Sequence, residues 1–376
     1  MIRIIADSHI PLIKGILEPY AFIEYMPGEV IKQQNLKNTD ALIIRTRTKC
    51  DSSLLKNTAI KFIASATIGT DHIDLDYCSR NNISVKNAPG CNSASVCQYI
   101  MSALISIAKK HKFSLQNKTI GIIGHGNVGI KVAKFAKVLG MNVLLNDPPK
   151  QNNNSHINYV SLDKIKRKAD IISLHVPLTR SGQYKTQQLI DAKFISDISP
   201  DTILINSSRG EVVDETYLKV ALKTGKINTT VLDVWNNEPD IDKELLELTE
   251  FGTPHIAGYS VDGKANGSAM VINKISSFFN FNLNNWHPDN LPCVKNRILN
   301  PLSFGKSDEE ILYNIVLNTY DIQANNDILK LDPGKFENLR YKHPIRREYP
   351  FYKLSINGLS ENLVKQLGDL GFNLSC

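Results

Sequence analysis

The chain has 376 residues, of which 42% are hydrophobic and 22% charged, and 44 Lys and Arg against 37 Asp and Glu give a formal net charge of +7. This length exceeds what one hydrophobic core usually organises, so we expect two or three domains, and the composition excludes wholesale disorder. The basic excess suits an anionic substrate as well as nucleic acid. Because no run of five or six like charges occurs, we expect no nucleic-acid partner.

Cysteine spacing and hydropathy indicate the compartment. The six cysteines form no Cys-x-x-Cys pair and have no histidines at zinc spacing, so reduced thiols and no metal site are expected. Asp7 and His9 interrupt the N-terminal apolar run before it reaches signal-peptide length, and no run approaches the roughly 18 apolar residues that span a membrane. We therefore expect a cytoplasmic protein without a membrane partner.

The first part of the chain alternates short β-rich runs with helix-forming segments, which predicts a parallel α/β sheet. Apolar residues then recur at helical period over 93–112, which predicts a long helix leaving this domain. The four predicted strands are 1–7, 22–26, 41–45 and 61–67.

A second α/β series follows, and its five strands suffice for a nucleotide-binding sheet. Helix-forming segments at 130–139 and 216–225 separate some of them, and the polar stretch 151–158 is predicted to be a surface loop. A second long helical pattern after Gly258, running to Phe279, is expected to return the chain to the first domain. The five strands are predicted at 118–124, 142–147, 170–176, 202–207 and 229–235.

Beyond about Asn290 the pattern changes again. Ser307 and Glu310 form a predicted capping box before a helix over 311–320, and a strand at 353–358 precedes a helix capped at Ser360. The predicted fold is α/β, with two Rossmann-like or flavodoxin-like parallel-sheet domains and a smaller C-terminal α/β dimerisation domain. The predicted boundaries are 1–95 plus 258–288 for a discontinuous substrate domain, 96–257 for the nucleotide-binding domain, and 289–376 for the C-terminal domain.

A glycine-rich turn marks the expected cofactor site. Gly124, Gly126 and Gly129 stand between a predicted strand and an amphipathic helix, where they permit a tight turn, close approach of a pyrophosphate and close packing of helix on strand. Asn127 and Val128 complete this loop. Asp147 ends the next strand, 18 residues after Gly129, where a carboxylate binds ribose hydroxyls and repels a 2′-phosphate. This arrangement predicts NAD rather than NADP. The alternative for Asp147 is a turn residue before two prolines.

Three further groups follow predicted strands, where ligands bind in open parallel sheets. Arg209 follows one strand, Glu238 the next, and His255 lies shortly beyond. Oxidation of a 2-hydroxy acid needs a base for the hydroxyl proton and a cation for the carboxylate. Arginine grips a carboxylate with two donors, and histidine titrates near neutral pH. These three residues are therefore the predicted catalytic centre, although each alone has an ordinary structural explanation.

With these motifs the chain resembles the D-2-hydroxyacid dehydrogenase superfamily, and most closely a subgroup acting on a four-carbon phosphorylated acid. Besides the glycine turn and the three catalytic candidates, the matching segments are 66–74, 88–92, 184–186 and 252–259. The resemblance implies that Arg209 binds the substrate carboxylate, His255 accepts the hydroxyl proton, and Glu238 orients His255. It also implies a small phosphorylated 2-hydroxy acid as substrate and a homodimer formed through the C-terminal domain.

The resemblance further assigns binding residues. Ser208 departs from the cysteine expected in many relatives. The positions implied around the cofactor are Val176 through its backbone, Ser207, Ser208, Asp233 and Gly258. Those implied to contact substrate are Thr46, Thr67 and Tyr259.

The cations that hold a substrate phosphate stay open at this point. One candidate group is Arg45, Arg47 and Lys49, and another is Arg346 with Arg347, delivered across a dimer interface; a solvated basic face explains either group equally well. Three other functions compete. They are a related dehydrogenase acting on 3-phosphoglycerate, a non-catalytic NAD(H)-sensing corepressor, and a methyltransferase, which would leave the three catalytic candidates unexplained.

Overall fold

The computed structural model describes residues 1–153, 156–283, 285–301 and 305–375, which fold as two compact units. Unit 1 comprises Met1–Asn92 and Ser260–Pro292, and unit 2 comprises Ser93–Tyr259 and Cys293–Cys376. The C-terminal segment, defined here as residues 293–375, therefore packs in the same unit as the glycine-rich turn. The predicted three-domain division stays a prediction. Within the described residues no helix is both long and apolar enough to cross a membrane.

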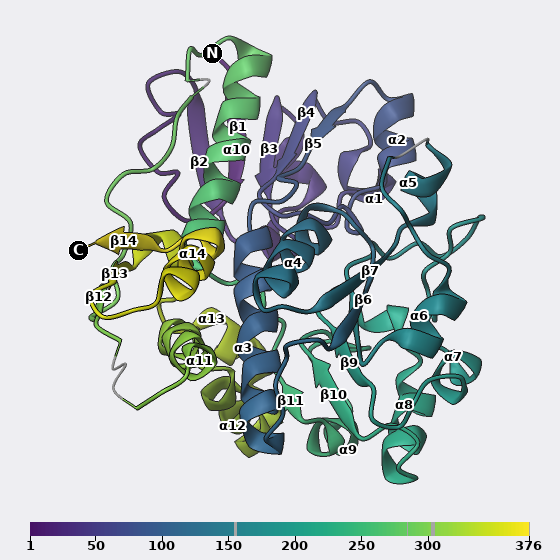
Figure 1. Cartoon of the computed structure of the whole chain (residues 1–376). Helices are drawn as coiled ribbons and strands as arrows, with labels where there is room; N and C mark the ends of the chain where they lie inside the picture. The colour runs from purple at the N-terminus through teal and green to yellow at the C-terminus, as the bar shows by residue number, and fades with distance from the viewer. Residues whose placement is uncertain (154–155, 284, 302–304, 376) are drawn as a thin grey trace. The chain divides into compact units, whose positions relative to one another are not determined.

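Unit 1 is built on a five-stranded parallel sheet in the order β2-β1-β3-β4-β5 (Figure 1). Helix α10 (Val261–Phe279) packs on β4, where the ring of Phe278 lies 4.5 Å from that of the buried Phe62. Four of these strands are predicted by the sequence, whereas the half-exposed β5 is not. The strands are β1 (Arg3–Asp7), β2 (Phe22–Met26), β3 (Ala41–Ile44), β4 (Phe62–Ser65) and β5 (Ser84–Lys86), with helices α1 (Ser52–Leu55) and α2 (Leu75–Arg80).

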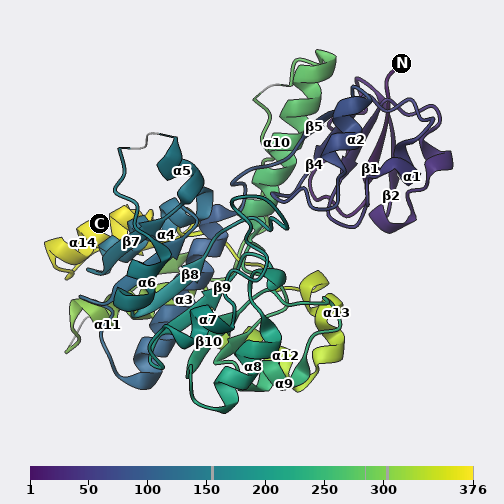
Figure 2. The ribbon, with the colours of Figure 1, turned by 90° about the vertical axis from the view of Figure 1, so that its right-hand side faces the viewer.

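Unit 2 contains a six-stranded parallel sheet in the order β11-β10-β9-β8-β6-β7, of which β7, β8, β9 and β10 are labelled in Figure 2. Four central strands are almost wholly buried and mostly apolar, as expected for a parallel sheet covered on both faces. The five predicted strands are present, and the two-residue β11 is a sixth. The strands are β6 (Thr119–Ile123), β7 (Asn142–Asn146), β8 (Ile171–Leu174), β9 (Ile203–Asn206), β10 (Thr229–Leu232) and β11 (Phe251–Gly252).

The helices around this sheet include one that corrects the predicted loop at 151–158. Helix α5 (Pro148–Asn152) forms because Asp147 accepts a hydrogen bond from the amide of Lys150 and prolines occupy the first turn, where no amide donor is needed. Residues 154–155 of that loop lie outside the described residues. The remaining helices are α3 (Ser93–His111), α4 (Asn127–Val138), α6 (Leu162–Lys168), α7 (Ala192–Ser196), α8 (Glu215–Lys223) and α9 (Lys243–Leu248).

The C-terminal segment covers surfaces of unit 2 that a nucleotide-binding sheet would otherwise expose. Helix α14 packs on α4, while α12 packs on β11 and on α3 (Figures 1 and 2). Buried Gln98 of α3 donates to the Thr319 hydroxyl and the Arg347 carbonyl, which satisfies its amide donors in the core. The elements are β12 (Ile298–Leu299), α11 (Asp308–Thr319), α12 (Ile322–Leu331), α13 (Phe336–Tyr341), β13 (Lys353–Ser355), α14 (Glu361–Leu370) and β14 (Asn373–Ser375).

Local signals in this segment act as predicted. The Ser307 hydroxyl accepts from the amide of Glu310, and the Glu310 carboxylate accepts from the amide of Ser307, so the capping box is confirmed. Ser360 caps α14 through the amide of Leu363. Single 3-10 turns in the chain are Gly28–Val30, Gln33–Leu36, Gly210–Val212, Pro333–Lys335 and Tyr349–Phe351.

Candidate active site

Three adjacent strand ends in unit 2 carry the predicted catalytic residues. Arg209 follows β9, Glu238 follows β10, and His255 follows β11, and these strands are neighbours in the sheet. Gly210 lets the first two loops touch, because a Cβ there would lie 2.1 Å from the backbone carbon of Trp235. A glycine after Arg209 is thus a steric requirement for bringing the loops together.

Glu238 and His255 form a hydrogen-bonded pair. Nδ1 of His255 lies 2.8 Å from Oε2 of Glu238, and the side chains are 33% and 21% exposed, so the imidazole remains reachable from solvent. The other carboxylate oxygen accepts the amide of Trp235 at 3.0 Å. Burial raises the pKa of Glu238, but the opposing effects of His255 and the Trp235 amide are larger together, and the pKa is lowered. Glu238 therefore stays ionised and holds the imidazole through Nδ1, leaving Nε2 for a substrate.

The loop that carries His255 is held by Asp233. The amides of Ile256 and Ala257 donate to the two carboxylate oxygens at 2.7 and 2.9 Å, and the hydroxyl of Thr253 donates at 2.7 Å. His255 itself has φ +56, a conformation rare for residues other than glycine, and its amide donates to the carbonyl of Asp233 at 2.7 Å. These bonds maintain a backbone geometry that His255 alone would disfavour.

This arrangement alters how Asp233 is understood. Its side chain is buried and engaged with the His255 loop, whereas the sequence predicts a place for it beside the cofactor. Burial raises the pKa of Asp233. His255 and the three hydrogen-bond donors lower it, but by less, so the pKa is raised overall. Contact with a cofactor stays a prediction, and positioning of the loop is what the hydrogen bonds establish.

Arg209 is half-buried in the loop that follows β9. Its Nη1 donates to the carbonyl of Ser208 at 2.7 Å, and Asn206 receives both the amide and the hydroxyl of Ser208 on its side-chain oxygen. Ser208 is therefore engaged in shaping the loop. Because one donor of Arg209 is tied to the loop backbone, its guanidinium is oriented before any substrate arrives.

The glycine-rich turn has the shape that a dinucleotide requires. A Cβ on Gly124 would lie 2.5 Å from the carbonyl oxygen of His175, and one on Gly129 would lie 2.1 Å from the carbonyl oxygen of Gly124, whereas nothing stands within 4 Å at Gly126. Gly124 and Gly129 thus permit close packing, and Gly126 faces open space. Because the turn also ends at the N-terminus of α4, where Asn127 and Val128 offer amides, the residues present fit a bound pyrophosphate.

Asp147 directly follows β7, as predicted, but it also has local partners. One carboxylate oxygen accepts the amide of His125 at 2.9 Å and the other the amide of Lys150 at 3.1 Å. The turn role and the ribose role are therefore compatible, since each carboxylate oxygen accepts more than one hydrogen bond. Its binding of a ribose stays a prediction.

Other predicted cofactor positions also lie in unit 2. The hydroxyl of Ser207, just after β9, is buried and has no hydrogen-bond partner among the described residues, which is the kind of atom a ligand would satisfy. Val176 is half-buried after β8, and Gly258 is half-buried after the His255 loop. Ser207 thus supports a ligand at this edge of the sheet.

Unit 1 holds two of the predicted substrate residues. Thr46 is exposed just after β3, and Thr67 is half-buried just after β4, the neighbouring strand. The Thr67 hydroxyl lies 2.8 Å from that of Ser65. Both threonines therefore occur at the carboxyl edge of the unit 1 sheet, the edge at which ligands bind in such sheets.

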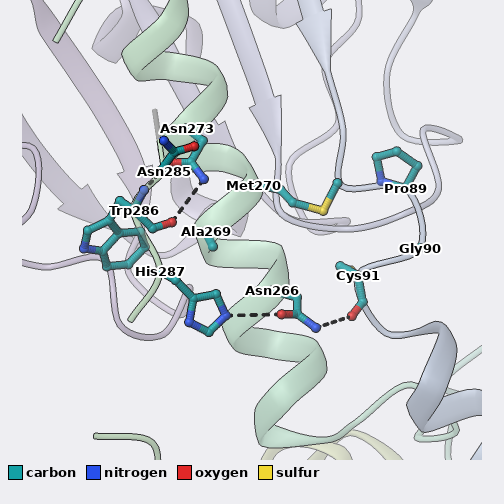
Figure 3. A pocket seen from close by; sticks show the side chains of 10 residues that line it. All are labelled: Pro89, Gly90, Cys91, Asn266, Ala269, Met270, Asn273, Asn285, Trp286 and His287. Carbon is teal, nitrogen blue, oxygen red and sulfur yellow. Dashed lines mark hydrogen bonds between the residues drawn. The ribbon is translucent and has the colours of Figure 1, made fainter. Parts of the chain in front are cut away.

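A hollow of about 450 Å³ in unit 1 lies along α10 and is distinct from these strand ends (Figure 3). Three of its polar side chains, Asn266, Asn273 and His287, are paired with one another or with the backbone. Asn266 bonds His287 and the carbonyl of Cys91, and Asn273 bonds both backbone groups of Trp286. These bonds fasten segment 285–287 to α10, so the hollow has a structural explanation.

Comparisons with known proteins agree with this geometry. A family model described as D-isomer specific 2-hydroxyacid dehydrogenase, NAD binding domain, matches residues 101–257. An erythronate-4-phosphate dehydrogenase of Bacteroides fragilis is 44% identical over 355 residues, covering 94% of this chain and 99% of its own. Another from Hahella chejuensis is 39% identical over 381 residues and covers 99% of each chain. The chain belongs to the erythronate-4-phosphate dehydrogenase family.

Solved structures share the fold of this dehydrogenase. The TT0316 protein of Thermus thermophilus has a TM-score of 0.65 at 23% identity and covers 78% of this chain and 100% of its own. A D-lactate dehydrogenase of Aquifex aeolicus, in complex with NAD and lactic acid, has a TM-score of 0.62 at 26% identity, covering 74% and 96%. The predicted fold class is confirmed, and the protein is an NAD-dependent dehydrogenase, which excludes the corepressor and methyltransferase alternatives.

Two groups at the site of this dehydrogenase are not predicted from the sequence. Glu215 begins α8 and is buried, and its carboxylate accepts the amide of Asn236 at 2.8 Å in the loop leading to Glu238. Arg340 of α13 lies over the ring of Tyr259. An acidic residue in the first turn of a helix and an arginine in a polar stretch are typical of surfaces, so no local signal distinguishes either one.

Proposed function

We propose that this dehydrogenase oxidises 4-phospho-D-erythronate to (R)-3-hydroxy-2-oxo-4-phosphooxybutanoate with NAD, as a step of pyridoxal 5′-phosphate synthesis. The observation that carries the proposal is the 2.8 Å Glu238–His255 pair beside the Arg209 loop. The relatives named erythronate-4-phosphate dehydrogenase supply the substrate, because they match along almost the entire chain.

In the proposed reaction the acid loses a hydride from C2 and a proton from its hydroxyl, leaving a 2-oxo acid. Arg209 holds the substrate carboxylate with two parallel donors and sets the distance from C2 to the imidazole. Nε2 of His255 takes the hydroxyl proton, and ionised Glu238 stabilises the imidazolium that forms. When bound, NAD supplies the hydride acceptor. Its pyrophosphate would be held by the turn at Gly124, Gly126 and Gly129.

Substrate choice tests the proposal directly. Purified protein should reduce NAD with 4-phospho-D-erythronate and much more slowly with 3-phosphoglycerate. The opposite preference would move the assignment to another member of the wider family. Both substrates are phosphorylated 2-hydroxy acids. The comparison therefore isolates the effect of chain length and of the second hydroxyl on the rate.

We also infer a cytoplasmic homodimer assembled through the C-terminal segment. Exposed apolar side chains there support an interface, with Ile298 63% and Ile345 51% exposed. Analytical ultracentrifugation measures the assembly state. A monomer at micromolar concentration would contradict the inference.

A further inference from the structure

Helix α13 places an arginine of the C-terminal segment beside the candidate active site. The guanidinium carbon of Arg340 lies 5.7 Å from the ring centre of Tyr259 and 6.0 Å from that of buried Phe336. Tyr259 follows the loop that carries His255. Because Phe336 anchors the start of α13 in the apolar core, the guanidinium is held against two rings.

One buried N–H group of this guanidinium has no hydrogen-bond acceptor among the described residues. Nη1 donates to Glu337, one helical turn away, at 3.1 Å, and Nε is buried without a partner among the described residues. The side chain is only 14% exposed. A buried N–H group without an acceptor costs free energy. An anion that accepted a hydrogen bond from Nε would remove this cost and would be bound more tightly.

Burial lowers the pKa of Arg340, but Tyr259, Glu337 and Glu238 together raise it, so the guanidinium stays charged beside the catalytic pair. Arg340 contributes to the lowered pKa of Glu238, which places the guanidinium within electrostatic reach of the His255 partner. The carboxylate of Glu337 is 39% exposed, so its pair with Arg340 is of the weak surface kind. Glu337 therefore competes only weakly with an added anion for the guanidinium.

The cations predicted from the sequence have other engagements. Arg45 donates to buried Asp7 at 2.9 Å, and Lys49 pairs with Asp51 at 2.9 Å. Arg346 and Arg347, predicted either as a phosphate cradle or as part of a solvated basic face, are 3% and 7% exposed.

Packing explains the burial of these two arginines. Arg346 lies 4.4 Å from the ring centre of Tyr320 and donates to the carbonyl of Ala257, while Arg347 lies 3.9 Å from that of Phe351. Because both side chains are almost wholly buried against rings, the structure does not support them as an exposed phosphate cradle.

We propose that Arg340 binds the phosphate of the substrate and makes the dehydrogenase specific for phosphorylated acids. Arg209 would hold the carboxylate at one end of the acid, and Arg340 the phosphate at the other, with the hydroxyl carbon at His255 between them. Arginine suits this role because its donors match two phosphate oxygens at once. The inference rests on the proposed function, since that function supplies the phosphate.

The test compares substrates with and without the phosphate. Arg340→Ala and Arg340→Lys are assayed with 4-phospho-D-erythronate and with D-erythronate. For Arg340→Ala, kcat/KM with the phosphorylated acid should fall about 10- to 100-fold, as expected for loss of a charge-assisted hydrogen bond, and the fall with D-erythronate should be much smaller. Arg340→Lys should recover part of the loss.

A matched control is Arg297→Ala, which removes another C-terminal arginine that lies over an aromatic ring, 5.1 Å from the centre of Phe351. It should affect neither substrate. Equal losses with both acids in the Arg340 variants would overturn the inference and leave Arg340 a support for Glu238. If Arg340→Ala fails to fold, the same comparison made with Arg340→Lys decides. Failure of the wild-type protein to oxidise 4-phospho-D-erythronate would instead contradict the proposed function.

Discussion

The strand ends of the unit 2 sheet and the C-terminal segment position their charged side chains in different ways. At the strand ends, Arg209, Glu238 and His255 are brought together by sheet order and by backbone contacts such as that at Gly210. In the C-terminal segment, Arg340 and Arg346 lie over the rings of Tyr259 and Tyr320, which are distant in sequence. The placement of functional side chains at strand ends follows from the sheet topology. The placement of side chains from the C-terminal segment depends on tertiary packing.

The largest effect is expected from a substitution at the strand ends, at His255. His255→Asn should lower kcat by about 10²- to 10⁴-fold, because the general base is lost. Asparagine tolerates the positive φ of this position, so the loss would report chemistry more than backbone strain. The rate of NADH formation is the measurement. His111→Asn, an exposed histidine of α3, is the control, and near-normal turnover of His255→Asn would remove His255 from its proposed role.

A smaller effect is expected at the carboxylate-binding arginine. Arg209→Lys keeps the charge but loses the paired donors, so kcat/KM should fall about 10- to 100-fold. Steady-state kinetics with saturating NAD measure this. Arg180→Lys, an exposed arginine paired with Glu211, provides the comparison and should be silent. An equal response of the two variants would contradict the proposed role of Arg209 in binding the carboxylate.

A substitution of Glu215 tests whether a buried carboxylate beside the strand-end loops affects the stability of the protein. Burial raises the pKa of Glu215 to about 7 from an ordinary 4.5. Between these values the folded protein binds more protons at Glu215 than the unfolded chain does, so the contribution of Glu215 to stability is fully present below pH 4.5 and is lost as pH rises through 7. Glu215→Gln should remove this decline, which amounts to at most about 3 kcal/mol.

Thermal unfolding midpoints at about pH 5 and about pH 8 measure that difference. Glutamine can still accept the amide of Asn236, so the variant keeps the hydrogen bond and removes the titration. Glu211→Gln, on an exposed side chain, serves as the control. If the wild type and Glu215→Gln respond alike to pH, Glu215 does not titrate in this range.

The smallest expected effect concerns the cofactor. Asp147→Asn should reduce the preference for NAD over NADP by about tenfold, the scale of one hydrogen bond to a charged group, because the carboxylate no longer repels a 2′-phosphate. The ratio of kcat/KM for the two cofactors reports it. Asp163→Asn, an exposed aspartate of α6, should leave the ratio unchanged. A wild-type protein that preferred NADP would contradict the assignment of Asp147 at the outset.

The elements that the sequence predicted best are those with strong local signals. The apolar runs of β6, β8 and β9 and the capping box at Ser307 depend on residues close together in the chain. The sequence does not predict strand β11, because two residues are too few to show a hydrophobic period. It does not predict β5, because the side chains of that strand are only partly buried. Helix α5 was missed because its prolines indicate a turn as readily as a first helical turn.

By itself, the sequence determined the parallel α/β fold, the nucleotide-binding turn and the identity of the catalytic candidates, since motif order and strand-end position are local properties. Only the tertiary structure decided that Asp233 holds the His255 loop, that Arg346 and Arg347 are buried, and that Arg340 reaches Tyr259. These outcomes depend on contacts between segments far apart in the chain. The burial of a charged group is set by which rings and carbonyls pack around it, and no local pattern encodes that environment.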